Sequence, residues 1–185
     1  FDIDGSGRID VLTNEGWYRN LNGSGAFGPL QPIPEVGYPD FLTVGDLDGD
    51  GDGDLIVIGS HDGNGDERLI VWVENRGAEG FLHRTLDERE AGSSYTARIW
   101  PVDVDEDGDL DLVSSIFVHA RPSTIEYSLY ENLDGMGFFS RPQPLPIEAT
   151  PLLVTNLDRI GSADVIFAAD DSNSLSYFET PIRVE

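Results

Sequence analysis

Four acidic stretches recur along the chain, and their regularly spaced carboxylates are the residues best suited to chemistry. The strings DIDGSGRIDVL, DLDGDGDGDLIV, DVDEDGDLDLVS and NLDRIGSADVIF begin at Asp2, Asp46, Asp103 and Asn156. In the second string, aspartates fill loop positions 1, 3, 5, 7 and 9, where bare charges would repel one another strongly. A divalent cation relieves that repulsion, and calcium prefers about six to eight hard oxygen ligands. The spacing therefore predicts calcium sites.

We expect positions 1, 3, 5 and 9 to bind through side chains, and position 7 through its backbone carbonyl. The second and third loops are complete, so both are predicted to be strong sites. Their predicted ligands are Asp46, Asp48, Asp50, Asp52, Asp54, Asp103, Asp105, Asp107, Asp109 and Asp111, with Asp52 and Asp109 binding through their carbonyls.

The first and fourth loops depart from this pattern. In the first loop a serine hydroxyl replaces one carboxylate, so a weaker site is expected. Its predicted ligands are Asp2, Asp4, Ser6, Arg8 (through its carbonyl) and Asp10. The fourth loop is expected to be degenerate or empty, because Ile160 has no side-chain oxygen. Its weak candidates are Asn156, Asp158 and Asp164.

Other interpretations of the acidic loops fit less well. An EF-hand needs a glutamate at position 12 and flanking helices. Position 12 here is Thr13, Val57, Ser114 or Phe167, each among strand-forming residues. No His or Cys accompanies the carboxylates, which disfavours zinc and iron, and magnesium tolerates a flexible cage of protein oxygens less readily. A single acidic run would be a solvated turn, but copies in register, each leading into an apolar run, favour metal binding.

The repeat also predicts the fold. Each unit holds short extended runs separated by Gly, Asp and Asn, and no segment shows a helical period. In the second unit we expect strands at 41–44, 55–58, 69–73 and 81–86. Four-stranded units of about 40–50 residues are typical of β-propeller blades. The chain is predicted to be all-β, one propeller region over residues 1–185. Its expected blades are 1–40 (without a first strand), 41–92, 93–148 and 149–185.

Composition limits the classes of partner. The formal net charge of the 185 residues is -24, so the chain should repel nucleic acid and anionic membranes. No apolar stretch is long enough for a membrane helix. Cysteine is absent, so disulfides cannot staple the fold and bound metal would have to do so.

Other candidate residues have simpler explanations. The recurring glutamates are expected to serve the blades rather than catalysis: Glu74, Glu131 and Glu179. The recurring asparagines are expected in turns: Asn20, Asn75 and Asn132. The histidines share no catalytic spacing: His61, His83 and His119. The recurring aromatic residues are expected in the core: Trp17, Trp72, Tyr130 and Tyr177. Trp100 matches no other unit and is the better candidate for ligand binding, and residues 61–68 are interpreted as a hairpin loop.

At the string DLDGDGDGDL, and at the pair Phe27–Gly28, the sequence resembles the FG-GAP-like (VCBS-type) repeat family. The resemblance implies a β-propeller in which calcium rigidifies the acidic loops. It also implies a secreted or cell-surface module, which we expect to mediate adhesion or the binding of a protein or glycan. The family does not fix one activity, but no non-repeating cluster of catalytic side chains is seen in the sequence, so we expect no enzymatic activity. Because the sequence starts within a motif, we expect it to be half of a seven- or eight-bladed propeller, with a closed four-bladed propeller as the alternative. Two other functions stay open, a part of a propeller-type polysaccharide lyase or glycoside hydrolase and a structural spacer.

Overall fold

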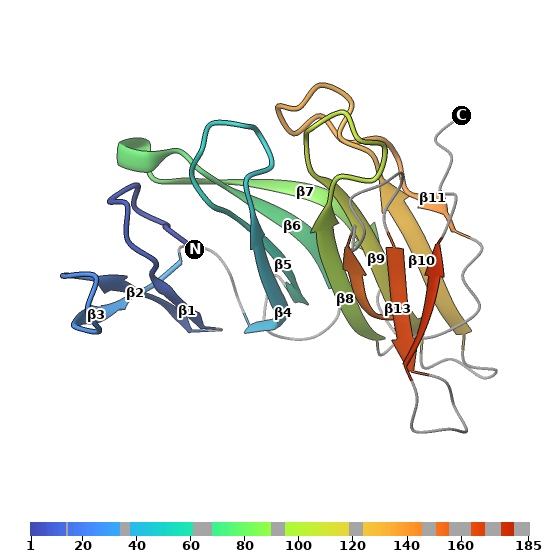
Figure 1. The fold of residues 1–185 in the computed structure, drawn as a ribbon, viewed down its shortest axis with the longest axis horizontal. Helices are drawn as coiled ribbons and strands as arrows, with labels where there is room; N and C mark the ends of the chain where they lie inside the picture. Colours follow the sequence, from blue (N-terminus) through green and yellow to red (C-terminus); the bar gives the residue numbers. More distant parts are fainter. Residues whose placement is uncertain are drawn as a thin grey trace. The chain divides into compact units, whose positions relative to one another are not determined.

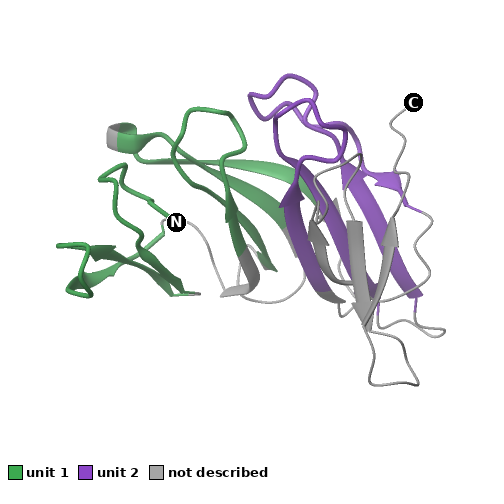
Figure 2. Ribbon diagram, viewed as in Figure 1, with its two compact units in different colours: residues 1–93 green, residues 94–185 purple. Residues whose placement is uncertain are grey.

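The computed structural model describes most of the chain. The described residues are 1–13, 15–33, 38–60, 68–89, 95–118, 124–145, 151–155, 164–168 and 175–179. They divide into two compact units, Phe1–Ser93 and Ser94–Glu185 (Figure 2). Each unit contains two sheets, and each sheet is an antiparallel meander whose strands follow chain order.

The first unit holds a three-stranded and a four-stranded sheet (Figure 1). The three-stranded sheet consists of β1 (Val11–Thr13), β2 (Gly16–Asn20) and β3 (Phe27–Gln31). The four-stranded sheet consists of β4 (Tyr38–Gly45), β5 (Asp54–Ser60), β6 (Arg68–Asn75) and β7 (Phe81–Arg89). A short 3-10 turn, Gly77–Glu79, lies between β6 and β7. No other helix occurs among the described residues.

The second unit repeats this architecture. One sheet contains β8 (Tyr95–Val102), β9 (Asp111–Val118), β10 (Thr124–Tyr130) and β11 (Gln143–Pro144). The other contains β12 (Pro151–Thr155), β13 (Asp164–Ala168) and β14 (Leu175–Glu179). The all-β prediction is confirmed. The first and the fourth sheet each have three described strands, and the division of the chain into blades stays a prediction.

The strands of the second sheet lie where the sequence placed them, but each is longer than predicted. β4 starts three residues before the expected strand at 41–44, and β7 extends to Arg89 instead of ending at residue 86. The sequence pattern missed the polar ends of these strands, because antiparallel pairing extends beyond the apolar residues that signal a strand. Arg68, the first residue of β6, for example pairs with Arg89, the last residue of β7.

Packing between sheets explains why the central strands are apolar along their whole length. All four residues of Leu55–Ile58 on β5 are buried, as expected for a strand covered on both faces. In the first unit one apolar cluster joins the two sheets; it contains Ile3, Trp17, Ile33, Leu55, Val57 and Val73. The second unit has a cluster of its own, made of Trp100, Val102, Val104, Val113 and Leu129.

The recurring aromatic residues belong to the core. Trp72 and Tyr130 are 0% and 1% exposed, and Trp17 is buried as well. The interpretation of Trp100 as a ligand-binding residue is wrong, because its side chain is 9% exposed and packs in the apolar cluster of the second unit. The side chain of Tyr177, and residues His61 and His119, lie outside the described part of the chain.

Within the described residues, the structure has no helix long and apolar enough to cross a membrane.

Leu55→Ala should lower the free energy of unfolding by about 2–5 kcal/mol, because it opens a cavity between the two sheets of the first unit. The matched control is Leu82→Ala on β7, whose side chain is 37% exposed and should cost much less. Urea titrations of both variants measure the difference. Equal losses of unfolding free energy in the two variants would contradict the burial of Leu55 between the two sheets.

Candidate metal centre

The first three acidic loops share one backbone conformation, fixed by the carboxylate at position 1. This carboxylate accepts a hydrogen bond from the backbone N–H of the glycine at position 6. The N···O distances are 2.5 Å for Gly7–Asp2, 3.2 Å for Gly51–Asp46 and 3.2 Å for Gly108–Asp103. All three glycines have positive φ, of 77°, 93° and 100°, a region that favours glycine. The repeat in sequence is therefore a repeat in loop geometry.

The aspartate at position 9 joins each loop to its sheet. Asp10, Asp54 and Asp111 are 5%, 0% and 1% exposed. One oxygen of each accepts from the backbone N–H of position 2, at 2.9–3.0 Å. The other accepts from the backbone N–H of the asparagine that follows in the sheet, at 2.7–2.8 Å; these asparagines are Asn20, Asn75 and Asn132. We call this arrangement the aspartate clasp, and it holds the two ends of each loop together.

The recurring asparagines, which were predicted to be turn residues, complete the clasp. All three are buried. Their Nδ2 atoms donate to the carbonyl of position 8 in each loop, at 2.9 Å for Ile9, 3.3 Å for Gly53 and 3.4 Å for Leu110. Sequence reasoning noted their recurrence but missed their link to the acidic loop. A signal was present in two units, since Asn75 and Asn132 each follow the position-9 aspartate by 21 residues, whereas Asn20 follows it by 10.

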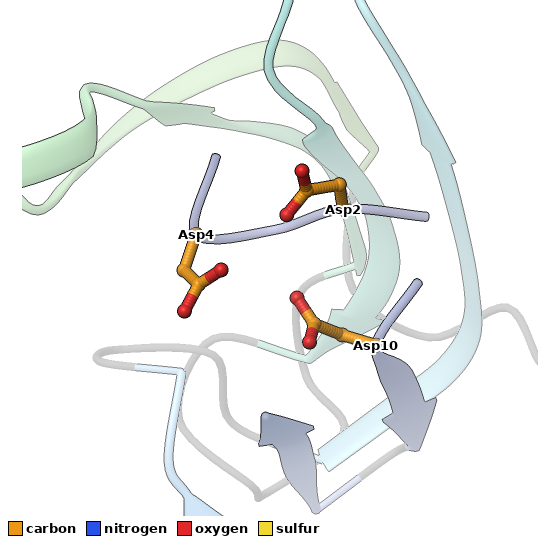
Figure 3. A group of neighbouring side chains, drawn as sticks. All are labelled: Asp2, Asp4 and Asp10. Carbon is orange, nitrogen blue, oxygen red and sulfur yellow. The ribbon is translucent and has the colours of Figure 1, made fainter. Parts of the chain in front are cut away.

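Alternate carboxylates gather on the inner side of each loop. Ligand oxygens lie within 4.8 Å of one another in three groups: Asp2, Asp4 and Asp10; Asp46, Asp48 and Asp50; and Asp103, Asp105 and Asp111. Figure 3 shows the first group, with its three carboxylates facing a common space. The structure therefore brings together nine of the predicted ligands. Asp54 and Asp107 fall outside these groups, and Asp54 uses both oxygens in the clasp.

The position-7 side chain lies against the turn that follows β2, β6 or β10. We call this turn the return turn (residues 21–26, 76–80 and 133–138). Each return turn carries a glycine at this contact. A Cβ added to the glycine would lie 3.7 Å from Arg8 at Gly23, 3.9 Å from Asp52 at Gly77 and 2.7 Å from Asp109 at Gly135. Position 7 was predicted to bind through its carbonyl, and that role stays a prediction.

Side-chain oxygens in all three described loops are buried without a hydrogen-bond partner. They are Oδ2 of Asp4, Oγ of Ser6, and Oδ1 of Asp46, Asp52 and Asp109. A buried, unpaired carboxylate oxygen is costly unless a cation or donor satisfies it. Asp46 also belongs to a group of hard oxygens within 4.8 Å of one another, which fits a calcium ion better than a soft metal.

Crowding and burial make some of these carboxyls weak acids in the absence of a cation. Burial, together with the charge of Asp50, raises the pKa of Asp52 to about 7. Burial also raises the pKa of Asp54 to about 7, against the opposing effect of its two backbone N–H donors. In the third loop, burial and the neighbouring Asp107 raise the pKa of Asp109 to about 7, and burial raises that of Asp111 to about 6. A cation bound nearby would oppose these shifts, because it favours the charged form of each carboxyl.

The fourth loop lies mostly outside the described residues. Asn156 and Asp158 fall in the part of the chain that is left undescribed, and so does Ile160. Asp164 is the first residue of β13. The expectation of a degenerate fourth site stays a prediction.

The family model of the FG-GAP-like repeat matches residues 2–57 and 46–114, which together exceed half of the chain. The chain therefore belongs to the FG-GAP-like repeat family, whose units are β-propeller blades. No curated protein and no solved structure matches it.

One residue of the third loop carries backbone strain. Glu106 at position 4 has φ of 67°, whereas the first and second loops place Gly5 and Gly49 there. Glu106→Gly should therefore raise the free energy of unfolding by about 1 kcal/mol. Gly49→Ala is the reciprocal variant, and it should lower the stability by a similar amount. Chemical denaturation measures both, and a destabilised Glu106→Gly variant would contradict the assigned conformation.

The metal-free protein should lose stability as the pH rises from about 5 to about 7.5. The raised pKa values mean that the folded chain holds more protons than the unfolded chain across this window, so the free energy of unfolding falls with pH. Saturating calcium should remove the trend, because the ion replaces those protons. Urea titrations at both pH values, with chelator or with calcium, test this. The double variant Asp52→Asn/Asp109→Asn should show a weaker dependence of the free energy of unfolding on pH without metal. An unchanged dependence in this variant would contradict the role of these two carboxyls.

Proposed function

We propose that the chain is a calcium-stabilised β-propeller module that acts outside the cell and binds a protein or a glycan. One observation carries this proposal. Successive units present the same clasped acidic loop, with carboxylate oxygens gathered within 4.8 Å and buried oxygens left without partners. The second and third loops are the strong sites.

Calcium suits this chain for two further reasons. Sites of the modest affinity typical of extracellular modules, about 10⁻⁴–10⁻³ M, fill at extracellular calcium concentrations. The chain also has no cysteine, so an ion is the cross-link available to tie each loop. Calcium in this role rigidifies the loops and leaves other surfaces free for a partner.

Binding, rather than catalysis, is supported by the state of Glu74, one of the recurring glutamates. Glu74 is 7% exposed, and its two carboxylate oxygens contact Arg84 at 2.6 Å and Arg76 at 3.0 Å. Arg84 in turn lies 5.0 Å over the ring of Trp72. A carboxylate held this way lacks the access that a general acid or base needs. The net charge of -24 argues against nucleic acid as the partner.

Calcium should raise the melting temperature of the metal-free protein by several degrees, through preferential binding to the folded state. Asp48→Asn and Asp105→Asn each remove one gathered carboxylate, so each should weaken binding at its own loop by about tenfold or more. Isothermal titration calorimetry on the metal-free protein measures both affinities.

Glu126→Gln on β10 is the control variant, because it makes the same change of charge on an exposed side chain away from the loops. It should leave calcium binding unchanged. An unchanged melting temperature after complete chelation would overturn the proposal. A glycan and protein array probed with the calcium-loaded chain tests the binding function, whereas degradation of polysaccharides would favour the lyase or hydrolase alternative.

A further inference from the structure

The first acidic loop differs from the others in the side chain that faces its position-3 carboxylate. Arg19 on β2 forms an ion pair with Asp4, through its Nε and the Oδ2 of the aspartate. The other oxygen of Asp4, Oδ1, accepts the backbone N–H of Ser6 at 3.1 Å. The Asp4 side chain is only 16% exposed, so the pair is shielded from much of the solvent. Oδ1 of this predicted ligand is therefore occupied by a backbone N–H, and Oδ2, which makes no hydrogen bond, faces the positive charge of Arg19.

The position of Arg19 in the repeat makes this contrast informative. Arg19 immediately precedes the clasp asparagine Asn20, and the equivalent residues in the next two units are Glu74 and Glu131. The charge at this position is thus reversed in the first unit. In the second unit this place is taken by Glu74, whose carboxylate pairs with Arg84 and Arg76 instead of with a loop aspartate.

A second arginine also lies at the first loop. Arg8 occupies position 7, where the next two loops have Asp52 and Asp109. Its Nε donates to the carbonyl of Asn20 at 2.7 Å, and its aliphatic stem lies over Gly23. The first loop therefore combines three aspartates with two guanidinium groups, whereas the second loop has five aspartates and no basic residue.

The first loop is therefore balanced in part by charges of the chain itself, because Arg19 pairs with Asp4 and Arg8 lies over the return turn.

We propose that Arg19 is a built-in cation of the first acidic loop, where it takes the place of the divalent ion. The chain then binds two calcium ions, at the second and third loops, and its first loop stays closed without one. A calcium ion would need an Asp4 oxygen at about 2.3–2.6 Å, which the guanidinium of Arg19 obstructs both sterically and electrostatically. This inference rests on the calcium binding proposed above, and it gives a stronger reason for a weak first site than Ser6 does.

Calorimetric titration of the metal-free chain with calcium tests this inference. The wild type should bind two ions. Arg19→Gln and Arg19→Glu should each create a third site, and the glutamate variant, which reproduces the second unit, should bind it about tenfold more tightly than the glutamine variant. Adding Asp4→Asn to either variant should abolish the third site, which assigns that site to the first loop.

Two controls separate the outcomes. Arg98→Gln removes the same charge from an exposed position on β8, and it should leave two ions bound. Asp4→Asn in the wild type should also leave two, because Asp4 pairs with Arg19 there and binds no ion. This second control does not depend on the folding of the Arg19 variants.

The results also distinguish this inference from the function on which it rests. Three ions in the wild type, or a fall in the number of bound ions on Asp4→Asn, would overturn the role of Arg19 and leave the calcium module intact. If the wild type and both Arg19 variants all bound two ions, the role of Arg19 would again be overturned and the calcium module would remain. Binding of no ion by any of these proteins would overturn the proposed function as well.

Discussion

The buried aspartate at position 9 is the interaction on which the other features of each unit depend. Its carboxylate accepts one backbone N–H from the start of the loop and one from the end of the adjacent strand. Hydrogen bonds to a charged group are worth about 1.5–3 kcal/mol each, and leaving such a group unpaired in the interior costs more. The clasp therefore fixes where the loop begins and ends, and only then can the carboxylates at positions 1, 3 and 5 converge.

Groups of the chain share part of the negative charge of each acidic loop. Backbone N–H groups donate to the carboxylates at positions 1 and 9 in every described loop. The first loop adds two arginines, and the second and third loops leave buried oxygens for which a divalent ion is the natural partner.

The sequence predicted the all-β fold, the repeat and the convergence of the aspartates, because these features follow from local periodicity and spacing. It did not predict the pairing of Arg19 with Asp4, because that contact depends on how β2 returns beside the loop 15 residues earlier. Nor did it place Trp100 in the core, since its burial is decided by which face of β8 meets the neighbouring strands. Contacts set by strand register and sheet packing are hidden from a one-dimensional pattern.

The amide of Asn75 donates to the carbonyl of Gly53 in its own loop at 3.3 Å, and to the carbonyl of Ile3 in the loop of the preceding sheet at 2.6 Å. A single side chain thereby ties two loops from separate sheets of the first unit. Neither loop can swing open without breaking a bond that belongs to the other, so mechanical load or local unfolding passes between neighbouring repeats. The two acidic loops of the Phe1–Ser93 unit are therefore coupled through one buried side chain.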